Sequence, residues 1–426
     1  MMKKKLLTAV PALVLLLIAA VVAFKYIKPP PNKIIISTST DEGDYQTYAK
    51  LYQEIIKEDG VSLEIRPSEG SLENLHRLDD PNSDVDAGFM QDGLGSTDSS
   101  PDLVSLGSLY YEPVWIFYRN GIKNLTRFSQ LIGKKIAIGH SSGGTAVLTK
   151  RLLKASDITE KNAHFVEIGW QDALDALNKG SVDVAFFIAT PDDVLIQKMM
   201  AEPNLHLMDV DQAEAITRKI PFLHHLVLPH GTMNLSKNIP PQDINLISPT
   251  ATLVVRDTLS PALTILLLKA ASQVHGEPGI FEKKNEFPID KDYEFPLSEE
   301  ATRFYKTGIP FWHRYLPFWI ATLIERFIIL ILPLLILIFP FVKMVPKVID
   351  NRIRSKIYKQ YGELKYLETQ MQSHLDEKSH DGFLAKLDKI EENVNLLKVP
   401  IEFSEHIYVL REHIDFVRER LKRKQS

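Results

Sequence analysis

Two long apolar segments constrain what this sequence can fold into more than any other feature. The first, Leu6–Phe24, is a run of 19 uncharged residues, and the second is Pro317–Val342, which is uncharged from Phe327 onward. A helix of about 20 apolar residues crosses a hydrocarbon core of about 30 Å. We therefore expect two transmembrane helices. The first segment has a second interpretation, because Val21 and Ala23 could form the small-residue cleavage pair of a secretory signal.

The charges that flank these segments predict their orientation. Lys3–Lys5 precede the first segment, and six basic residues against the single acid Asp350 follow the second between positions 343 and 359. Basic residues are retained on the cytoplasmic side. We expect a protein of the bacterial inner (cytoplasmic) membrane, with residues 32–316 periplasmic or extracytoplasmic and a cytoplasmic C-terminal tail.

The net charge is distributed unevenly along the chain. The total of −4 divides into +4 for residues 1–25, +3 for residues 343–426 and −11 for the part between them. An acidic exported part argues against nucleic acid as a partner. The chain contains no cysteine, which excludes disulfides, thiolate metal sites and a cysteine nucleophile.

The exported part has the alternating pattern of an α/β fold. Strands are expected at Lys33–Ser37, Val61–Arg66 and Asp86–Met90, and again at Leu131–Gly139 and Val182–Ile188, with amphipathic helices between them. Two successive α/β units predict two lobes joined by crossing strands. The expected domains are an N-terminal anchor or signal at 1–31, a two-lobed domain at 32–310, a transmembrane helix at 317–342 and a helical tail at 343–426. Lobe I would comprise about 32–112 plus 230–310, and lobe II about 113–229.

Polar residues that follow the expected strands are the candidate ligand-binding residues, because ligands in such sheets bind at the carboxyl ends of strands. The glycine-rich turn His140–Thr145 lies between a strand and a helix, where exposed amides suit a carboxylate or another anion. An ordinary turn remains the alternative. The candidates are Ser37, Thr38, Ser39, Thr40, Tyr45, Gln91, Asp92, Ser141, Ser142, Gly143, Gly144, Thr145, Thr190 and Pro191.

The same turn also fits the G-x-S-x-G nucleophile elbow of serine hydrolases, with Ser141 as the nucleophile. Asp183 or Asp192 would supply the acid, and His224, His225 or His230 the base. The upstream sequence has no His-Gly-Gly-Gly oxyanion segment, so a hydrolase is the lesser alternative and we expect no catalytic residue. The histidines lack the spacing of a zinc site, and no cofactor is expected.

The order of several segments resembles the TAXI-type solute receptors of tripartite ATP-independent periplasmic (TRAP) transporters. The resemblance covers residues 33–280 and rests on KIIISTSTDEGDY at 33–45, VDAGFMQDG at 85–93, SLYYEPVWIFYR at 108–119, LIGKKIAIGHSSGGT at 131–145, ALNKGSVDVAFFIATP at 176–191 and SPTATLVVRDTLSPAL at 248–263. It implies a two-lobed, type II periplasmic-binding-protein-like domain that closes over an amino acid or a carboxylate and delivers it to membrane permease subunits. This chain departs from the family in its first loop, which has only Gly43, and in its second apolar segment.

The tail after residue 343 has helical periodicity without catalytic motifs. One apolar stripe contains Ile353, Ile357, Tyr361, Leu364 and Leu367, and another contains Ile407, Leu410, Ile414, Val417 and Leu421. Such stripes predict a small helical hairpin or a coiled coil. Self-association or contact with a membrane subunit is expected of them, and a solvated tail without such a contact is the alternative. A membrane-anchored sensor that signals through this tail is the main alternative to transport.

Overall fold

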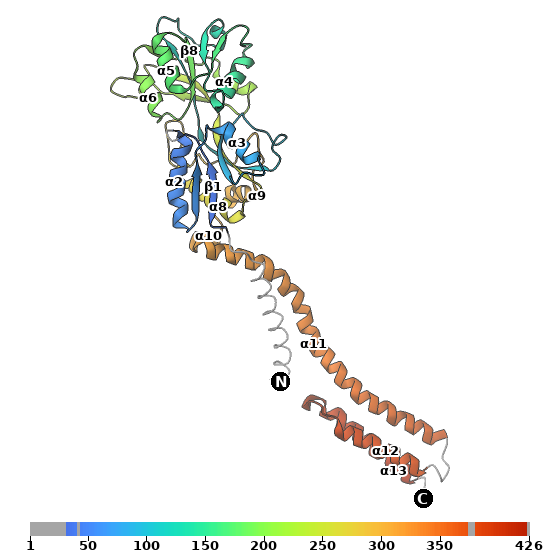
Figure 1. Cartoon of the computed structure of the whole chain (residues 1–426). Helices are drawn as coiled ribbons and strands as arrows, with labels where there is room; N and C mark the ends of the chain where they lie inside the picture. The colour runs from blue at the N-terminus through green and yellow to red at the C-terminus, as the bar shows by residue number, and fades with distance from the viewer. Residues whose placement is uncertain (1–30, 41–42, 374–379, 424–426) are drawn as a thin grey trace. The chain divides into compact units, whose positions relative to one another are not determined.

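The computed structural model describes residues 31–40, 43–373 and 380–423 (Figure 1). They divide into two compact units, one ending at Glu325 and the other beginning at Arg326. The first unit contains two five-stranded sheets with the strand orders β2-β1-β3-β12-β4 and β7-β6-β8-β5-β9. The predicted α/β class with two sheets is therefore confirmed.

The first sheet forms the centre of lobe I. Its strands are β1 (Lys33–Ser37), β2 (Ser62–Arg66), β3 (Ala87–Gln91), β4 (Leu103–Tyr111) and β12 (Thr250–Arg256), and its helices are α2 (Asp44–Glu58), α3 (Ser71–Asp79), α8 (Pro261–His275) and α9 (Glu299–Thr307). β1 is parallel to β2 and β3, and β12 is antiparallel to β3 and β4. The isoleucines of β1 are buried because parallel strands are covered by helices on both faces.

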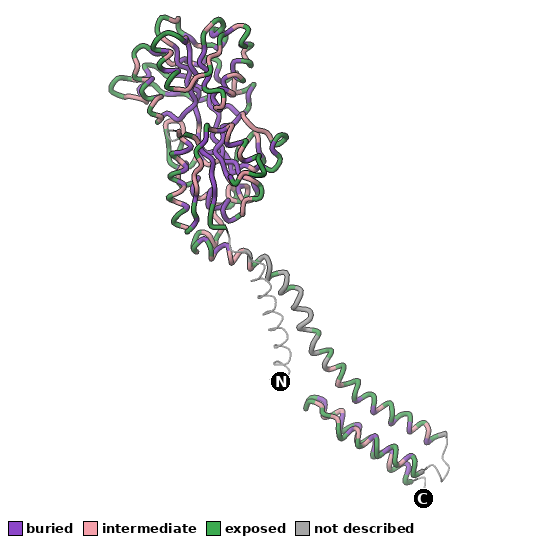
Figure 2. The backbone as a smooth tube through the Cα atoms, viewed as in Figure 1, coloured by how far each residue is buried: buried purple, intermediate pink, exposed green. Residues whose placement is uncertain are grey.

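The second sheet forms lobe II in the same way. Its strands are β5 (Val114–Arg119), β6 (Lys135–Ala137), β7 (His164–Val166), β8 (Val184–Ile188) and β9 (Leu205–Leu207), and its helical segments are η1 (Phe128–Leu131), α4 (Gly144–Ala155), α5 (Trp170–Lys179), α6 (Val194–Ala201) and α7 (Ala213–Lys219). Every residue of β8 is buried. Figure 2 shows the buried residues concentrated along the strands of both lobes.

The chain crosses between the lobes twice. It passes into lobe II between β4 and β5, and it returns between β11 (Ile244–Ser248) and β12. β11 pairs with β10 (His224–Leu228), and apolar residues of both strands are buried among those of lobe II. The return crossing therefore lies near Pro249, later than the expected boundary at 230. The two crossings are joined by the hydrogen bond from the Glu112 amide to the Pro249 carbonyl oxygen, at 3.1 Å.

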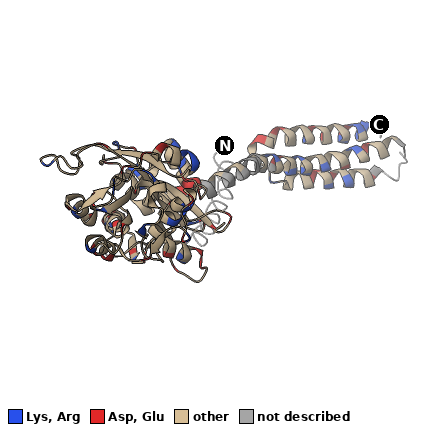
Figure 3. Cartoon of the chain, turned by 90° about the horizontal axis from the view of Figure 1, so that it is seen from above, with Lys and Arg blue, Asp and Glu red and all other residues tan. Residues whose placement is uncertain are grey.

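The second unit is helical in its described part. It includes most of α11 (Phe318–Ser373), together with α12 (His380–Leu396), η3 (Ile401–Phe403) and α13 (Ser404–Arg423); the short α10 (Phe311–Tyr315) belongs to the first unit. Residues of both predicted stripes, such as Leu364 and Leu410, are buried in one apolar cluster. Figure 3 marks the positions of acidic and basic residues along these helices. Arg418 of α13 forms an ion pair with Asp388 of α12, at 2.8 Å.

The expected transmembrane helices stay predictions. The first, Leu6–Phe24, lies outside the described residues. Within the described part of the chain, we found no helix whose length and apolar character would suffice to cross a membrane.

Candidate functional site

A cavity of about 210 Å³ lies between the two lobes and is lined by both of them. Lobe I contributes Ser39, Thr40, Gly43, Asp44, Tyr45, Glu69, Gly70, Ser71, Gln91 and Glu112, and lobe II contributes His140, Gly143, Gly144, Thr145, Trp170, Ile188 and Asp193.

The topology explains why these residues meet. In lobe I they follow β1, β2, β3 and β4, and in lobe II they follow β6, β7 and β8. The carboxyl ends of parallel strands share one edge of a sheet, and the adjoining crevice is where α/β folds bind ligands. The two sheets present these edges to each other across the cavity.

A chain of hydrogen bonds organises the lobe I wall. The Gln91 amide donates to Ser71 Oγ at 3.0 Å, and the Tyr45 hydroxyl lies 3.0 Å from the same Ser71 Oγ. Tyr45 also donates to Glu112 Oε2 at 3.3 Å. Gln91 is only 4% exposed, and its side-chain Nε2 has no hydrogen-bond partner among the described residues. Buried donors without a partner are rare, so this amide is a donor available to a ligand.

Carboxyl groups dominate the electrostatics of the cavity. Asp44, Glu69, Glu112 and Asp193 line it, and none of the described lining residues is lysine or arginine. Burial, followed by the nearby charge of Asp44, raises the pKa of Glu112 well above its usual range. Burial also raises the pKa of Asp44, although a hydrogen bond from the Thr190 amide opposes the shift.

The lobe II wall is built by the turn between β6 and α4. Gly139 has φ of 94°, which disfavours any residue with a side chain, and it lets the chain turn sharply after the strand. The first turn of α4 carries no acidic residue. Its free amides and the positive end of the helix dipole therefore remain available to an anion.

The lobes touch each other beside the cavity. The Thr190 amide of lobe II donates to Asp44 Oδ2 at 3.0 Å, and Arg151 Nη1 donates to the Gly93 carbonyl at 2.9 Å. A Cβ atom on Gly144 would lie 2.7 Å from Gln91 Oε1, so only glycine fits this approach without rearrangement.

Half of the fourteen sequence-predicted residues line the cavity. They are Ser39, Thr40, Tyr45, Gln91, Gly143, Gly144 and Thr145.

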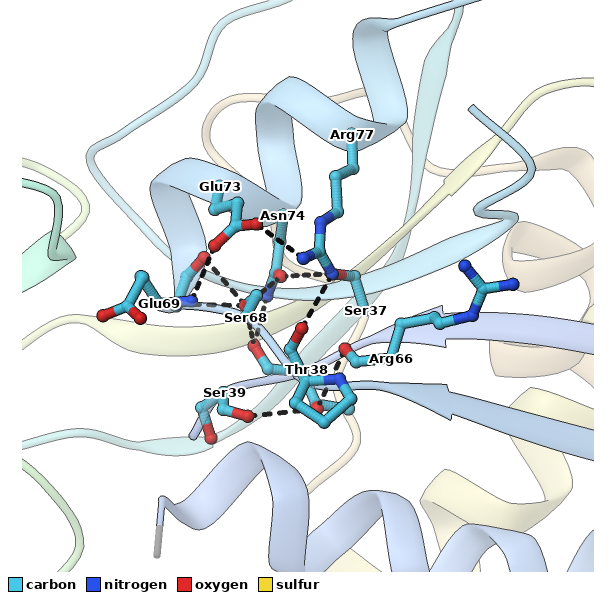
Figure 4. Close-up of polar contacts among 11 residues, drawn as sticks. Ser37, Thr38, Ser39, Arg66, Ser68, Glu69, Glu73, Asn74 and Arg77 are labelled. Atoms are coloured by element: carbon cyan, nitrogen blue, oxygen red, sulfur yellow. Dashed lines mark hydrogen bonds and ion pairs between the residues drawn. The ribbon is translucent and has the colours of Figure 1, made fainter. Parts of the chain in front are cut away.

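Ser37 and Thr38 do not line the cavity, because their side chains are used inside lobe I (Figure 4). Ser37 Oγ donates to Asn74 Oδ1 at 2.6 Å and accepts from Arg77 Nη1 at 3.0 Å. Thr38 Oγ1 donates to Gln46 Oε1 at 2.6 Å. Both residues are fully buried and hold the loop after β1 in place.

The other five predicted residues also lie outside the cavity lining. Asp92 accepts hydrogen bonds from Thr250 and Thr252 within lobe I, at 2.5 and 2.7 Å. Thr190 contributes to the contact between the lobes through its backbone amide, and the adjacent Pro191 is buried. Ser141 is exposed, and Ser142 Oγ lies 2.7 Å from His140 Nδ1 within its own turn.

Several residues of the hydrolase alternative have other partners in the structure. Asp183 accepts hydrogen bonds from Arg119 at 2.7 Å and from the Lys135 amide at 2.9 Å. His225 contacts Asn245, and His230 contacts Asp243. Asp183, His225 and His230 are thus paired with residues other than Ser141, and the His224 ring contacts Tyr111.

The sequence reasoning missed several lining residues, chiefly Asp44, Ser71, Trp170 and Asp193. Asp44, Ser71 and Trp170 are each the first residue of a helix that follows a strand, and Asp193 is the N-cap of α6. Extending the search from strand ends to the following helix starts would have found them. Within the described ranges, no group of three or more His, Asp or Glu residues is placed to hold a metal ion.

Comparisons with known proteins place the chain in a family. Similar solved structures include a protein of Bordetella bronchiseptica RB50, with 14% identity and a TM-score of 0.40 over 58% of this chain and 72% of that one. Another is the amino acid ABC transporter substrate-binding protein AbpA of Streptococcus pneumoniae bound to L-arginine, with 14% identity and a TM-score of 0.36 over 57% and 89%. A third is the periplasmic aliphatic sulphonate binding protein SsuA of Escherichia coli, with 16% identity and a TM-score of 0.34 over 45% and 68%. No curated protein sequence matches significantly. The NMT1-like family model matches residues 36–307, so the chain belongs to the NMT1-like family.

Proposed function

We propose that this protein is the extracytoplasmic solute-binding subunit of a TRAP-type transporter of the TAXI kind. It would capture a small, carboxylate-bearing solute and deliver it to a membrane permease. The observation that carries the proposal is the cavity between the lobes, lined from both sides by residues at the carboxyl ends of strands. The resemblance of the segments at 33–45 and 131–145 to TAXI receptors supports the transporter class.

The mechanism is closure of the lobes around the solute. The ligand stabilises the closed state because it contacts both walls only when the lobes meet. The solute carboxylate lies at the start of α4, whose first turn has no acid of its own. The contacts between Asp44 and Thr190 and between Arg151 and Gly93 add to the closed state.

Membrane attachment is the second part of the proposal. The apolar segments Leu6–Phe24 and Pro317–Val342 anchor the receptor in the inner membrane, with the solute domain outside and residues 343–426 in the cytoplasm. This arrangement would keep the receptor close to its permease.

A thermal-shift screen of the full-length chain in detergent tests the receptor function. We expect a rise in melting temperature with one class among amino acids and mono- and dicarboxylic acids, because a ligand that binds only the folded state stabilises it. The same solute should be taken up by cells only when the receptor is present. A screen without any shift would contradict the proposal.

A membrane-anchored sensor is the second candidate, favoured by the buried apolar cluster that joins α11, α12 and α13. A solvated tail needs no such core, whereas a tail that transmits a signal does. Deleting residues 343–426 separates the two functions. Loss of uptake with solute binding intact supports a transport role for the tail, and intact uptake with an altered downstream response supports the sensor.

A further inference from the structure

The acidic residues of the lobe I wall indicate a second chemical group on the ligand, beside the anion that the start of α4 favours. Glu112 is 5% exposed, and its Oε2 accepts a hydrogen bond from the Tyr45 hydroxyl at 3.3 Å. Asp44 lines the same cavity and is bonded to the Thr190 amide. Neither carboxyl forms an ion pair with lysine or arginine in the described part of the chain. A buried carboxylate without a cation is costly, so Glu112 favours its protonated form, and a positive group on a ligand would take the place of that proton.

The unpartnered amide of Gln91 is an independent sign that a ligand belongs here. Its Nε2 is buried, lacks a partner among the described residues and belongs to a side chain that lines the cavity. A donor at this place needs an acceptor atom on the ligand. A small molecule that carries both a cation and a hydrogen-bond acceptor would therefore complement this wall.

We infer that the solute carries a primary ammonium group, which Asp44 and Glu112 hold, beside an acceptor group that faces Gln91 and the start of α4. An α-amino acid has this pair of groups on one carbon. A dicarboxylate or a 2-hydroxy acid of the same size would place an anion or a neutral hydroxyl against the acidic wall. This inference rests on the proposed receptor function and narrows its solute class.

Trp170 contributes to the same preference from lobe II. It is the first residue of α5 and lines the cavity, with its ring in edge contact with Phe187 at a centroid distance of 6.1 Å. An indole face attracts cations more strongly than the other aromatic rings do. Glu69 and Asp193 complete the negative lining, although Asp193 Oδ1 already accepts the Leu195 and Ile196 amides.

The test compares ligands with and without an ammonium group. Full-length protein in detergent is screened by thermal shift and calorimetry against amino acids, their 2-hydroxy-acid counterparts, simple amines and dicarboxylates. We expect shifts with amino acids or amines, and none with the hydroxy acids or dicarboxylates. Equal or tighter binding of a hydroxy acid or a dicarboxylate overturns the ammonium assignment while leaving the receptor function standing. A screen without any binding overturns both.

Two isosteric variants test whether Asp44 and Glu112 hold the ammonium group of the solute. Glu112→Gln and Asp44→Asn should each weaken binding of the amino acid found by about 10-fold or more, because each loses a charge-assisted hydrogen bond. Asp192→Asn is the matched control, since it removes an exposed carboxyl close to the cavity that does not line it. Circular dichroism spectra confirm that all three variants are folded. Unchanged affinity in both folded cavity variants, or an equal loss in the control, contradicts the assignment.

Discussion

The two lobes place three parallel strands in the same order, β2-β1-β3 and β7-β6-β8, but they have opposite chemistry where the helix after β1 or β6 begins. In lobe I, α2 follows β1 with Gly43 as its N-cap and Asp44 as its first residue. In lobe II, α4 follows β6 with Gly143 as its N-cap and Gly144 as its first residue. The acid of α2 already complements its helix dipole, whereas α4 leaves this position to another anion.

The comparison teaches that one backbone plan can present two kinds of helix start to the same cavity: a carboxylate within the negative wall of lobe I, and exposed amides at the start of α4, here called the positive wall. A single residue at the helix start sets the difference, because Asp brings a carboxylate and Gly leaves the amides exposed. The ligand is thereby expected to bind in one orientation, with its cation toward lobe I and its anion toward lobe II.

The largest expected effect comes from giving α4 the acid of α2. Gly144→Asp should reduce solute affinity by about 100-fold, because its Cβ would crowd Gln91 Oε1 and its carboxylate would repel the anion of the solute. Gly144→Asn makes the same steric change without the charge. The ratio of the solute affinities of the two variants, measured by calorimetry, therefore gives the electrostatic part of the loss. Gly169→Ala is the control, since an added Cβ meets nothing within 4 Å at this other N-cap of lobe II. Equal losses for Asp and Asn would refute the positive wall.

Gln91 offers a second test, in which stability and affinity should move in opposite directions. Gln91→Met should weaken solute binding by about 10-fold and stabilise the ligand-free protein by about 1 kcal/mol, because it removes a buried donor without a partner. Urea unfolding and calorimetry measure the two quantities. Gln53→Met is the control, since Gln53 Nε2 donates to the Leu63 carbonyl at 2.7 Å and lies outside the cavity lining; it should lose stability and keep its affinity.

The pH dependence of binding is the third test. Burial raises the pKa of Glu112 in the ligand-free protein, with Asp44, Tyr45 and Asp92 as its titratable neighbours. The folded protein therefore holds a proton that the unfolded chain releases, so stability should fall as pH rises above about 4.5. An ammonium ion would displace this proton, so affinity should rise with pH by up to about 10-fold per unit until the raised pKa is passed.

Glu112→Gln should flatten both pH dependences. Calorimetry in buffers of different ionisation enthalpy measures the released proton directly. His140→Gln is a useful companion, because His140 is the histidine among the described lining residues. A slope that survives in Glu112→Gln but disappears in His140→Gln would show that the wrong group had been assigned.

The fold was predictable because its elements have strong local signals. The isoleucines of β1 and the apolar run of β8 are continuous, as buried parallel strands require, and the stripes of α11 and α13 have clear helical periodicity. The return crossing was misplaced because β11 has the same apolar character as β12. The pairing of β11 with β10 and the burial of its apolar residues, Leu246 among them, in lobe II distinguish β11 from β12.

The site was predictable in its location but not in its charge. Polar residues after strands pointed to the right edge of each sheet, and the turn before α4 was found. Ser37 and Thr38 were predicted to bind the ligand together with Ser39 and Thr40. The sequence of four hydroxyl residues does not show which side chains face a neighbouring helix and which face the cavity. The acidic character of the wall depends on Glu112 and Asp44, which are about 70 residues apart in the sequence and line the same cavity only in the folded structure.

The smallest expected effect separates the two halves of that hydroxyl run. Ser37→Ala should lower the free energy of unfolding by about 1–2 kcal/mol and leave solute affinity unchanged, because its Oγ bonds only within lobe I, to Asn74 and Arg77. Ser39→Ala should instead weaken solute binding and leave the free energy of unfolding almost unchanged. Ser39 lines the cavity, and its hydrogen bonds to Gln46 and Thr40 are long, at 3.3 and 3.4 Å. Urea unfolding and calorimetry on both variants decide the matter. A loss of affinity in Ser37→Ala equal to that in Ser39→Ala would mean that the internal network of Figure 4 also positions the solute, and the lobe I wall would then extend one layer deeper than the cavity lining.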